Sequence, residues 1–210
     1  MQMFQGQAKD CLIVFFAGWG MDPRPFLPML GAVDVLLVWD YTHLPEAGLA
    51  LPQGRPVHAV AWSMGVWAAQ QVLAGQPVAS ATAVNGTPWP IDDERGIPEA
   101  VFRGTLEGFS EAGLARFRRR MCGGAAAMQD FLKAAPERSV EDLRGELAAL
   151  GAAIRARPDV SFPWSRAIAC MGDRIFPLAA QQAAFPQAEI RPGAHWAPEI
   201  FRVLLRGEKP

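Results

Sequence analysis

The 210-residue sequence lacks several features that would assign it to a class at once. It has no excess of either charge, with 20 lysines and arginines against 21 aspartates and glutamates, so no global attraction to nucleic acid is expected. No apolar run is long enough to cross a bilayer, and residues 1–10 lack the basic start and apolar core of a signal peptide. These absences predict a soluble, cytoplasmic protein with neither a nucleic-acid partner nor a membrane partner.

Cysteine and histidine are also scarce, with three residues of each. Cys11, Cys122 and Cys170 are scattered and odd in number, so they indicate no disulfide framework and favour a reducing compartment. None of them stands at a metal-binding spacing from a histidine, so no metal is expected. Hydrophobic residues, by contrast, make up 50% of the chain, which predicts one globular domain, or a core with a small insertion.

Short apolar runs alternate with helical patterns along most of the chain. The expected strands are 11–17, 35–39, 57–61, 78–84, 167–171 and, at a sheet edge, the more polar 187–191. The expected helices between them are 64–74, 178–184 and 198–205. This alternation predicts an α/β fold with a mostly parallel sheet flanked by helices. Ligands bind beyond the carboxyl ends of such strands, so chemistry is expected directly after each one.

One long region interrupts the alternation. Residues 87–161 contain no strand-like run and hold four amphipathic stretches instead, at 100–109, 112–121, 125–134 and 140–157. We predict that 87–161 is a helical cap inserted between two strands of a core made of 1–86 and 162–210. The cap is expected to cover the carboxyl edge of the sheet.

The most informative segment is Val57–Gly65, where an apolar run leads into Ala-Trp-Ser-Met-Gly and then into a helical pattern. This is the layout of a nucleophile elbow, a sharp strand-to-helix turn that presents the hydroxyl of Ser63. The usual motif is G-x-S-x-G, and Ala61 stands in place of its first glycine. Taken alone, Ser63 is equally well explained as the N-cap of the following helix.

Two other candidate strands are followed by groups that would complete a hydrolase site. Asp173 follows the strand expected at 167–171, and His195 follows the one at 187–191. His195 can act as the base for Ser63, and Asp173 can orient the imidazole and stabilise its charged form. The chain order Ser63, Asp173, His195 is that of α/β-hydrolases.

These assignments have plainer alternatives. Asp173 can serve as a helix cap and His195 as a structural loop histidine. Asp40 is a competing acid, although it stands early in the chain for this order of residues. His43, after a strand end, and His58, inside a strand run, are poorer candidates for the base.

The backbone offers two candidate donors for an oxyanion hole. The Gly18-Trp19-Gly20 loop follows the first strand, and its glycines let the N–H of Trp19 face the site. Met64, directly after Ser63, supplies a second N–H. Two converging donors are what acyl transfer requires, because charge develops on the carbonyl oxygen. The loop is otherwise an ordinary turn.

With these motifs assembled, the chain resembles the BioG-type pimeloyl-[acyl-carrier protein] methyl ester esterases, a compact branch of the α/β-hydrolases. The resemblance extends over nearly the whole chain and rests on Phe16–Asp22, Trp39–Tyr41, Ala61–Gly65, Asn85–Thr87 and Gly193–Trp196. It implies hydrolysis of the methyl ester of the pimeloyl carrier to pimeloyl-[acyl-carrier protein] and methanol, in biotin synthesis.

The resemblance also implies a role for each candidate residue. Ser63 would be the nucleophile, His195 the base and Asp173 its orienting acid, with the N–H groups of Trp19 and Met64 as the oxyanion hole. No metal and no organic cofactor are implied, because the serine and the oxyanion hole perform the chemistry.

Substrate recognition is expected to fall to the cap and its surroundings. The candidates for lining a tunnel are aromatic residues that could equally belong to the core: Trp62, Trp67, Trp89, Phe102, Phe109, Phe117 and Trp196. An acidic carrier protein needs a basic dock, and the densest positive run is Arg116, Arg118, Arg119 and Arg120. The same run also fits a merely solvated helix face. We expect a monomer whose partner is the acyl-carrier protein.

Several other functions are compatible with the same sequence. A general carboxylesterase or an acyl thioesterase would use the same triad. A non-catalytic binding protein with an α/β-hydrolase fold would not need it. Peroxidase or carbon–carbon bond chemistry also occurs on this scaffold.

Overall fold

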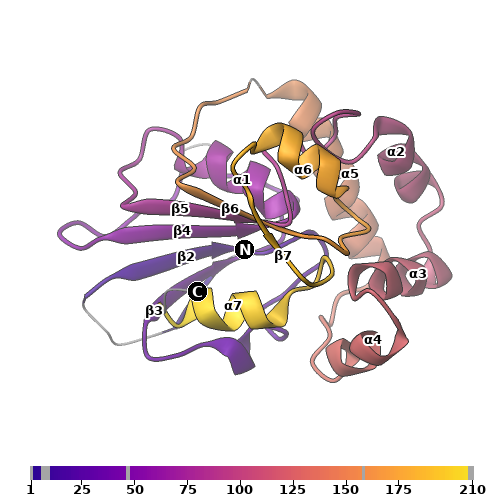
Figure 1. Cartoon of the computed structure of the whole chain (residues 1–210), viewed down its shortest axis with the longest axis horizontal. Helices are drawn as coiled ribbons and strands as arrows, with labels where there is room; N and C mark the ends of the chain where they lie inside the picture. The colour runs from indigo at the N-terminus through magenta and orange to yellow at the C-terminus, as the bar shows by residue number, and fades with distance from the viewer. Residues whose placement is uncertain (1, 6–9, 46–47, 158, 208–210) are drawn as a thin grey trace.

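The protein is built around a single mostly parallel sheet. The computed structural model describes residues 2–5, 10–45, 48–157 and 159–207. Within these residues, seven strands follow the order β1-β3-β2-β4-β5-β6-β7 across the sheet (Figure 1). The strands are β1 (Gln2–Gln5), β2 (Leu12–Phe16), β3 (Asp34–Val38), β4 (Val57–Trp62), β5 (Ser80–Val84), β6 (Arg166–Cys170) and β7 (Glu189–Arg191). Strands β2 to β7 are parallel, which confirms the α/β prediction.

Strand β1 is the one strand among the described residues that the sequence does not predict. It runs antiparallel to β3, with Gln2 opposite Val38 and Gln5 opposite Val35. The segment is short and its two glutamines interrupt the apolar pattern, so periodicity gives no signal for it. The segment is a strand because it pairs with β3, and its own sequence does not predict this.

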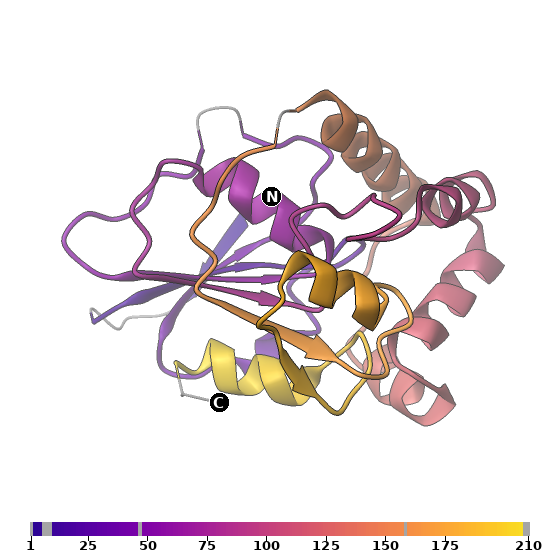
Figure 2. The same ribbon diagram turned by 45° about the horizontal axis from the view of Figure 1, so that its top comes forward.

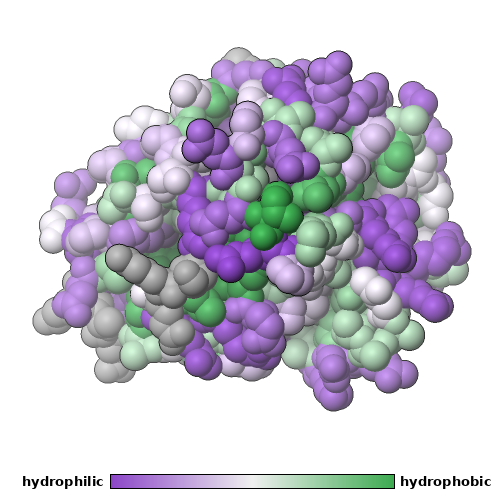
Figure 3. All heavy atoms as spheres, viewed as in Figure 1, coloured by the Kyte–Doolittle hydropathy of each residue, from purple (hydrophilic) through white to green (hydrophobic). Residues whose placement is uncertain are grey.

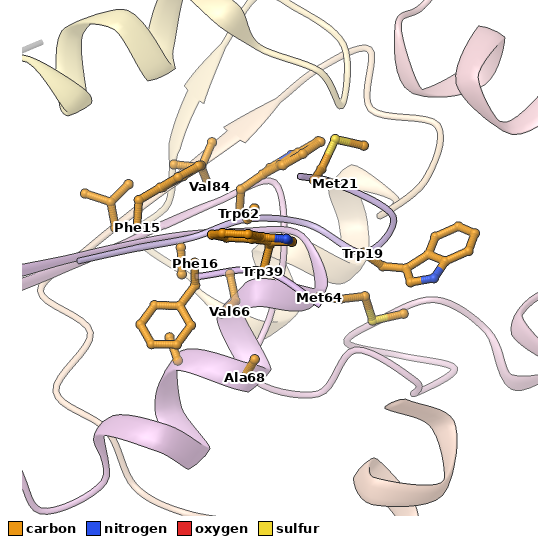
Figure 4. Packing of buried hydrophobic residues seen from close by; sticks show 14 of the residues in the cluster. Phe15, Phe16, Trp19, Met21, Trp39, Trp62, Met64, Val66, Ala68 and Val84 are labelled. Carbon is orange, nitrogen blue, oxygen red and sulfur yellow. The ribbon is translucent and has the colours of Figure 1, made fainter. Parts of the chain in front are cut away.

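The central strands are buried on both faces, as a parallel sheet between helices requires. All five residues of β2 are buried. Phe15 packs against Phe201 of α7 (Pro198–Leu205), with ring centroids 5.9 Å apart. Its neighbour Phe16 lies on the side of α1 (Met64–Leu73), as Figure 4 shows. Figures 1 and 2 accordingly place α1 and α7 on opposite sides of the sheet.

Four helices stand between β5 and β6 in chain order, within residues 87–161 where the sequence predicts amphipathic helices. They are α2 (Glu99–Glu107), α3 (Glu111–Met121), α4 (Ala125–Leu132) and α5 (Val140–Ala156). Helix α2 contacts α5, and α3 contacts α4. Figures 1 and 2 show α2, α3 and α4 gathered beyond one end of the strands.

Local signals set most helix ends. Helix α6 (Leu178–Ala184) and helix α7 have the bounds that the sequence predicts. Helices α3 and α5 begin at serine N-caps: the hydroxyl of Ser110 accepts from Gly113 N–H at 3.2 Å, and that of Ser139 accepts from Asp142 N–H at 3.0 Å. Side-chain capping thus explains where two of the four inserted helices start.

The surface offers no wide apolar area on the face shown in Figure 3, where hydrophobic and hydrophilic residues are interspersed. Among the large apolar side chains, Met171 and Ile190 are exposed. No helix among the described residues is long and apolar enough to cross a membrane.

The outer strand β7 is held to β6 by an ion pair. Arg166 Nε and Nη2 lie 2.6 and 2.8 Å from the two carboxylate oxygens of Glu189, and Arg191 adds a contact at 3.1 Å. The hydrogen bonds from Arg166 lower the pKa of Glu189 from 4.5 to about 2. The ionised carboxylate therefore stabilises the folded chain above its unfolded pKa.

We predict that Glu189→Gln lowers the free energy of unfolding by less than about 1 kcal/mol at neutral pH, because the Glu189 side chain is 40% exposed. The difference from the wild type should stay constant above pH 4.5 and disappear as the pH falls toward about 2. Urea unfolding of both proteins across this range measures it. A difference that persists at the acid end would contradict the ion-pair explanation.

Candidate active site

Ser63 sits in a strained turn between β4 and α1. Its backbone has φ of 60° and ψ of −131°, a conformation that residues with a Cβ rarely adopt. Its hydroxyl makes no capping hydrogen bond to α1, although Ser63 occupies the N-cap position. The structure therefore places Ser63 in an elbow whose hydroxyl is available for another partner.

The turn depends on two glycines that allow close backbone contacts. A Cβ on Gly65 would lie 2.4 Å from the carbonyl oxygen of Phe16, and one on Gly86 would lie 2.3 Å from the carbonyl oxygen of Ser63. Neither backbone can move aside as a side chain could. Ala61, in place of the first glycine of the usual motif, is fully buried with its methyl group accommodated. The elbow thus tolerates this departure from the motif.

The partner of the Ser63 hydroxyl is His195. Its Nε2 lies 2.9 Å from Ser63 Oγ, and its Nδ1 lies 2.8 Å from Asp173 Oδ2. All three residues are buried, at 5%, 1% and 7% exposure for Ser63, His195 and Asp173. The structure brings together the three residues that the sequence selects from three separate loops.

Asp173 has hydrogen-bond donors for both of its oxygens. Oδ1 accepts from the N–H groups of Ile175 and Phe176, and Oδ2 accepts from Gln181 Nε2 at 3.1 Å as well as facing His195. A buried, charged carboxylate is costly unless hydrogen-bond donors contact its oxygens, as they do here. The capping alternative is wrong, because helix α6 (Leu178–Ala184) has Pro177 at its N-cap and no side-chain capping hydrogen bond, and the N–H groups bound by Asp173 lie before it.

Two buried side chains hold the His195 loop, and the sequence analysis assigns neither this task. Asn85 Nδ2 donates to the carbonyl oxygens of Ala194 and His195, at 3.0 and 2.9 Å, while its Oδ1 accepts from Cys170 N–H. Trp62 Nε1 also donates to the His195 carbonyl, at 2.9 Å. Asn85 has φ of 45°, and in the sequence it is marked by its place after a strand and by the Asn85–Thr87 motif of the family resemblance.

The competing acid and bases have other partners. Asp40 Oδ1 accepts from the Thr42 hydroxyl at 2.7 Å and lies 3.3 Å from Arg138. His58 lies in β4 with its Nδ1 2.8 Å from the hydroxyl of Ser80, and His43 is exposed. Asp173 is therefore the acid that contacts His195.

The buried cysteines are poor alternative nucleophiles, because burial disfavours the thiolate. Burial raises the pKa of Cys122 to about 11. The pKa of Cys170 is also raised by burial. Among the described residues no group of three or more histidine, cysteine or acidic side chains could hold a metal ion.

Ser63 and His195 line a mostly apolar pocket, which lies between the sheet edge and the inserted helices. Four of the predicted aromatic residues line it: Trp19, expected for its backbone, and Trp62, Phe102 and Phe117, expected for their rings. Met64 lines it too, and Figure 4 shows Trp19 and Met64 extending beyond the packed strand residues. Both candidate oxyanion donors therefore belong to residues beside Ser63.

Four other predicted aromatic residues do not line this pocket. Trp67 is buried within α1, and Trp196 is buried among Phe26, Trp62 and Phe131. Those two belong to the core because apolar contacts surround them.

Phe109 and Trp89 contact residues outside the pocket lining or behind it. Phe109 packs on the Trp19 ring at 5.3 Å, behind the pocket wall. Trp89 donates to Asp159 at 3.1 Å and lies under the guanidinium of Arg95. Their assignment as lining residues is wrong for this pocket.

The four arginines of α3 do not share one surface. Arg116 and Arg120 line a groove between α2 and α3, and Arg120 also lines the pocket that contains Ser63. Arg118 lies over the ring of Phe131 at 5.9 Å, and burial lowers its pKa. Arg119 is exposed. The helical period separates Arg118 from the others, because only residues three or four apart share a face.

Comparisons with known proteins identify the family of this chain. A family model described as pimeloyl-ACP methyl esterase BioG matches residues 1–192. The malonyl-[acyl-carrier protein] O-methyltransferase of Bacteroides fragilis (strain 638R) is 45% identical over 204 residues, a match that covers 94% of this chain and 41% of that protein. The chain thus spans about two-fifths of the length of this relative.

Solved structures show the same similarity in three dimensions. The crystal structure of BioG from Haemophilus influenzae is 36% identical in sequence, with a TM-score of 0.86 and coverage of 96% of both chains. A hydrolase from Pseudomonas aeruginosa PA01 is 16% identical, with a TM-score of 0.64 over 96% of this chain and 90% of that one. At that identity the likeness shows the fold alone.

The parallel sheet, the serine elbow and the neighbouring hydrolase structure define the class of this protein as an α/β-hydrolase fold. The family match covers most of the chain, and the structural match to BioG covers nearly all of it. The chain belongs to the BioG family of pimeloyl-ACP methyl esterases.

We predict that Gly86→Ala lowers the free energy of unfolding by about 1–3 kcal/mol, because its Cβ would overlap the Ser63 backbone. Gly145→Ala on α5 is the matched control, since a Cβ there meets no atom within 4 Å. That control should be neutral or stabilising by up to about 1 kcal/mol. Urea denaturation compares the two, and equal stabilities would show that the elbow does not need Gly86.

Proposed function

We propose that this protein is a serine carboxylesterase that hydrolyses the methyl ester of pimeloyl-[acyl-carrier protein], giving pimeloyl-[acyl-carrier protein] and methanol in biotin synthesis. The observation that supports it best is the row of hydrogen bonds from Ser63 through His195 to Asp173, at the wall of an apolar pocket. Family membership supports the substrate.

In this proposal Ser63 Oγ attacks the ester carbonyl carbon while His195 Nε2 takes its proton. The new carbon–oxygen bond creates a tetrahedral oxyanion, which the N–H groups of Trp19 and Met64 stabilise. When the intermediate collapses, the imidazolium of His195 protonates the departing methoxide, and methanol leaves. Asp173 keeps the imidazole oriented and stabilises its positive charge.

Hydrolysis of the acyl-enzyme repeats these steps with water. His195 removes a proton from water, and the resulting hydroxide attacks the acyl carbon. The second tetrahedral intermediate expels Ser63 Oγ, which recovers its proton from His195. The balance consumes one water and releases one carboxylate, so neither a metal nor an organic cofactor is required.

We further propose that residues 87–161 act as a cap on a core formed by 1–86 and 162–210. Apolar pocket residues from the inserted helices, including Phe102 and Phe117, suit the methylene chain of a pimeloyl group. The groove between α2 and α3 shares Val101, Thr105 and Arg120 with that pocket. A carrier protein outside the groove would thus present only the methyl ester end to Ser63.

Charge supports a carrier protein as the partner. Arg116 and Arg120 line the groove, and Arg119 is exposed on the same helix. Figure 3 shows hydrophilic residues gathered over α3. Because carrier proteins are acidic, we propose these three arginines as the dock of a monomeric enzyme. Arg118 is left out because its guanidinium covers Phe131.

The name of the Bacteroides relative does not require methyl transfer by this chain. The match covers 41% of that protein, so most of it lies outside the matched part. We assign the methyl transfer in that relative to the unmatched part, and ester hydrolysis to the part that this chain resembles.

We predict that the wild type converts a methyl-pimeloyl carrier conjugate to the free carboxylate, observed by mass spectrometry of the intact carrier. Ser63→Ala should lower kcat by about 10⁵-fold or more. Asp173→Asn should lower it by about 10⁴-fold, because the imidazole loses its orienting partner. Asp40→Asn is the matched control, since its carboxylate contacts Thr42 and Arg138 instead of His195.

The same experiment separates the alternatives. Release of the acyl chain from the carrier thioester, with the methyl ester left intact, would indicate a thioesterase. A wild-type protein whose Ser63 resists a fluorophosphonate label would indicate a non-catalytic binding protein. Loss of turnover in Asp40→Asn, with Asp173→Asn active, would show that the proposed triad is wrong.

We predict that Arg116→Glu combined with Arg119→Glu lowers kcat/KM on the carrier-bound ester by about 10-fold or more, because an acidic partner is repelled. Hydrolysis of a small methyl ester should be unchanged, since neither side chain lines the pocket with Ser63. Arg144→Glu combined with Arg206→Glu, both exposed and outside α3, makes the same change in net charge and is the control. Equal losses on both substrates would point to damaged folding and not to a docking role.

A further inference from the structure

Glu146 of α5 is a buried acid that contacts two loops of the sheet. It is fully buried. Its Oε1 accepts from Tyr41 N–H at 3.0 Å, and its Oε2 accepts from Gly20 N–H at 3.3 Å. Gly20 follows β2 and Tyr41 follows β3. One side chain from the inserted helices therefore joins the loops after two neighbouring strands.

Arg138 balances the charge of Glu146. Its Nη1 lies 2.5 Å from Glu146 Oε2 and 3.4 Å from the carbonyl oxygen of Met21, and its Nη2 lies 3.3 Å from Asp40. Burial raises the pKa of Glu146, while Arg138 and the Tyr41 N–H act in the opposite direction. A buried acid is costly to ionise, so this set of donors is what keeps the carboxylate able to accept hydrogen bonds.

The same helix also holds the side chain of Trp19. Trp19 Nε1 donates to the carbonyl oxygen of Leu143 at 2.9 Å. Its ring packs edge-on against Phe109 and Phe117, with centroids 5.3 and 5.0 Å away. The peptide after Trp19 is fixed by Glu146 through Gly20 N–H. With the indole and the following peptide both anchored, the peptide that carries Trp19 N–H has little freedom left.

We infer that Glu146 is a positioning residue for the oxyanion hole, which keeps Trp19 N–H directed at the oxygen of the ester bound beside Ser63. This inference rests on the proposed function, in which that N–H stabilises the oxyanion. Oxyanion donors stabilise the transition state because they are oriented before the charge develops. A donor whose orientation varies loses most of this stabilisation. Glu146 thereby contributes to catalysis although it does not itself line the pocket.

The test is Glu146→Gln, which preserves volume but turns an amide NH₂ toward a group that previously faced a carboxylate oxygen. We expect kcat for a small activated ester to fall by about 10- to 100-fold, because the Trp19 loop loses its anchor. KM should change by less than about threefold, since substrate binding itself is untouched. Labelling of Ser63 by a fluorophosphonate, which also develops an oxyanion, should slow in parallel.

Asp34→Asn is the matched control. Asp34 is a buried acid 2.6 Å from Arg55, but it stands at the start of β3, the end opposite to the loops around Ser63. This variant should lower the unfolding midpoint and leave kcat close to that of the wild type. Should Glu146→Gln lose no more activity than Asp34→Asn at a matched loss of stability, Glu146 is merely structural and the inference is overturned.

A second variant covers the case in which Glu146→Gln does not fold. Glu146→Asp retains the negative charge beside Arg138 but shortens the reach to Gly20, so the expected result is a folded protein with lowered kcat. Wild-type kcat in this variant would overturn the inference.

The small ester and the label also separate this inference from the proposed function. A wild type that uses both but ignores the pimeloyl conjugate disproves the substrate only. A wild type in which Ser63 cannot be labelled disproves both.

Discussion

The strained backbone of Ser63 is the constraint on which the candidate site depends. A residue with φ of 60° persists only where its surroundings leave it no alternative, and here the carbonyl groups of Phe16 and Ser63 lie against Gly65 and Gly86. Because the elbow cannot relax into an ordinary N-cap, the hydroxyl faces His195 instead of the end of α1. The strand-to-helix turn thus converts a common capping residue into a group with a base beside it.

The fixed position of Ser63 matters only if His195 is held in place as well. The carbonyl oxygen of His195 receives two hydrogen bonds, one from Asn85 and one from Trp62, so the loop cannot drift from the elbow. Asn85 also binds the last residue of β6. Ser63 and His195 are therefore both anchored to the central strands. This anchoring keeps Ser63 Oγ and His195 Nε2 2.9 Å apart although the two residues are distant in the chain.

The inserted helices belong to the same rigid arrangement. They meet the core at Trp19, whose indole binds Leu143, at Gly20, which binds Glu146, and at Trp196, whose N–H donates to the Met121 carbonyl oxygen. A region that the chain adds between two strands consequently lines the pocket and also holds the loops around Ser63. The lining of the pocket and the geometry of these loops are therefore coupled through Trp19 and Met121.

By itself the sequence determined the α/β architecture, the bounds of the predicted elements to within two residues, and the choice of Ser63, Asp173 and His195 as candidates. Local features sufficed, because apolar runs predict strands and the loops after parallel strands meet at one edge. Only the tertiary structure decided the rest: the pairing that makes β1 a strand, the core position of Trp196, the contact of Arg118 with Phe131, and the hydrogen bonds of Asn85 and Glu146. These depend on contacts between residues far apart in the chain, and such contacts leave no periodic pattern in either segment.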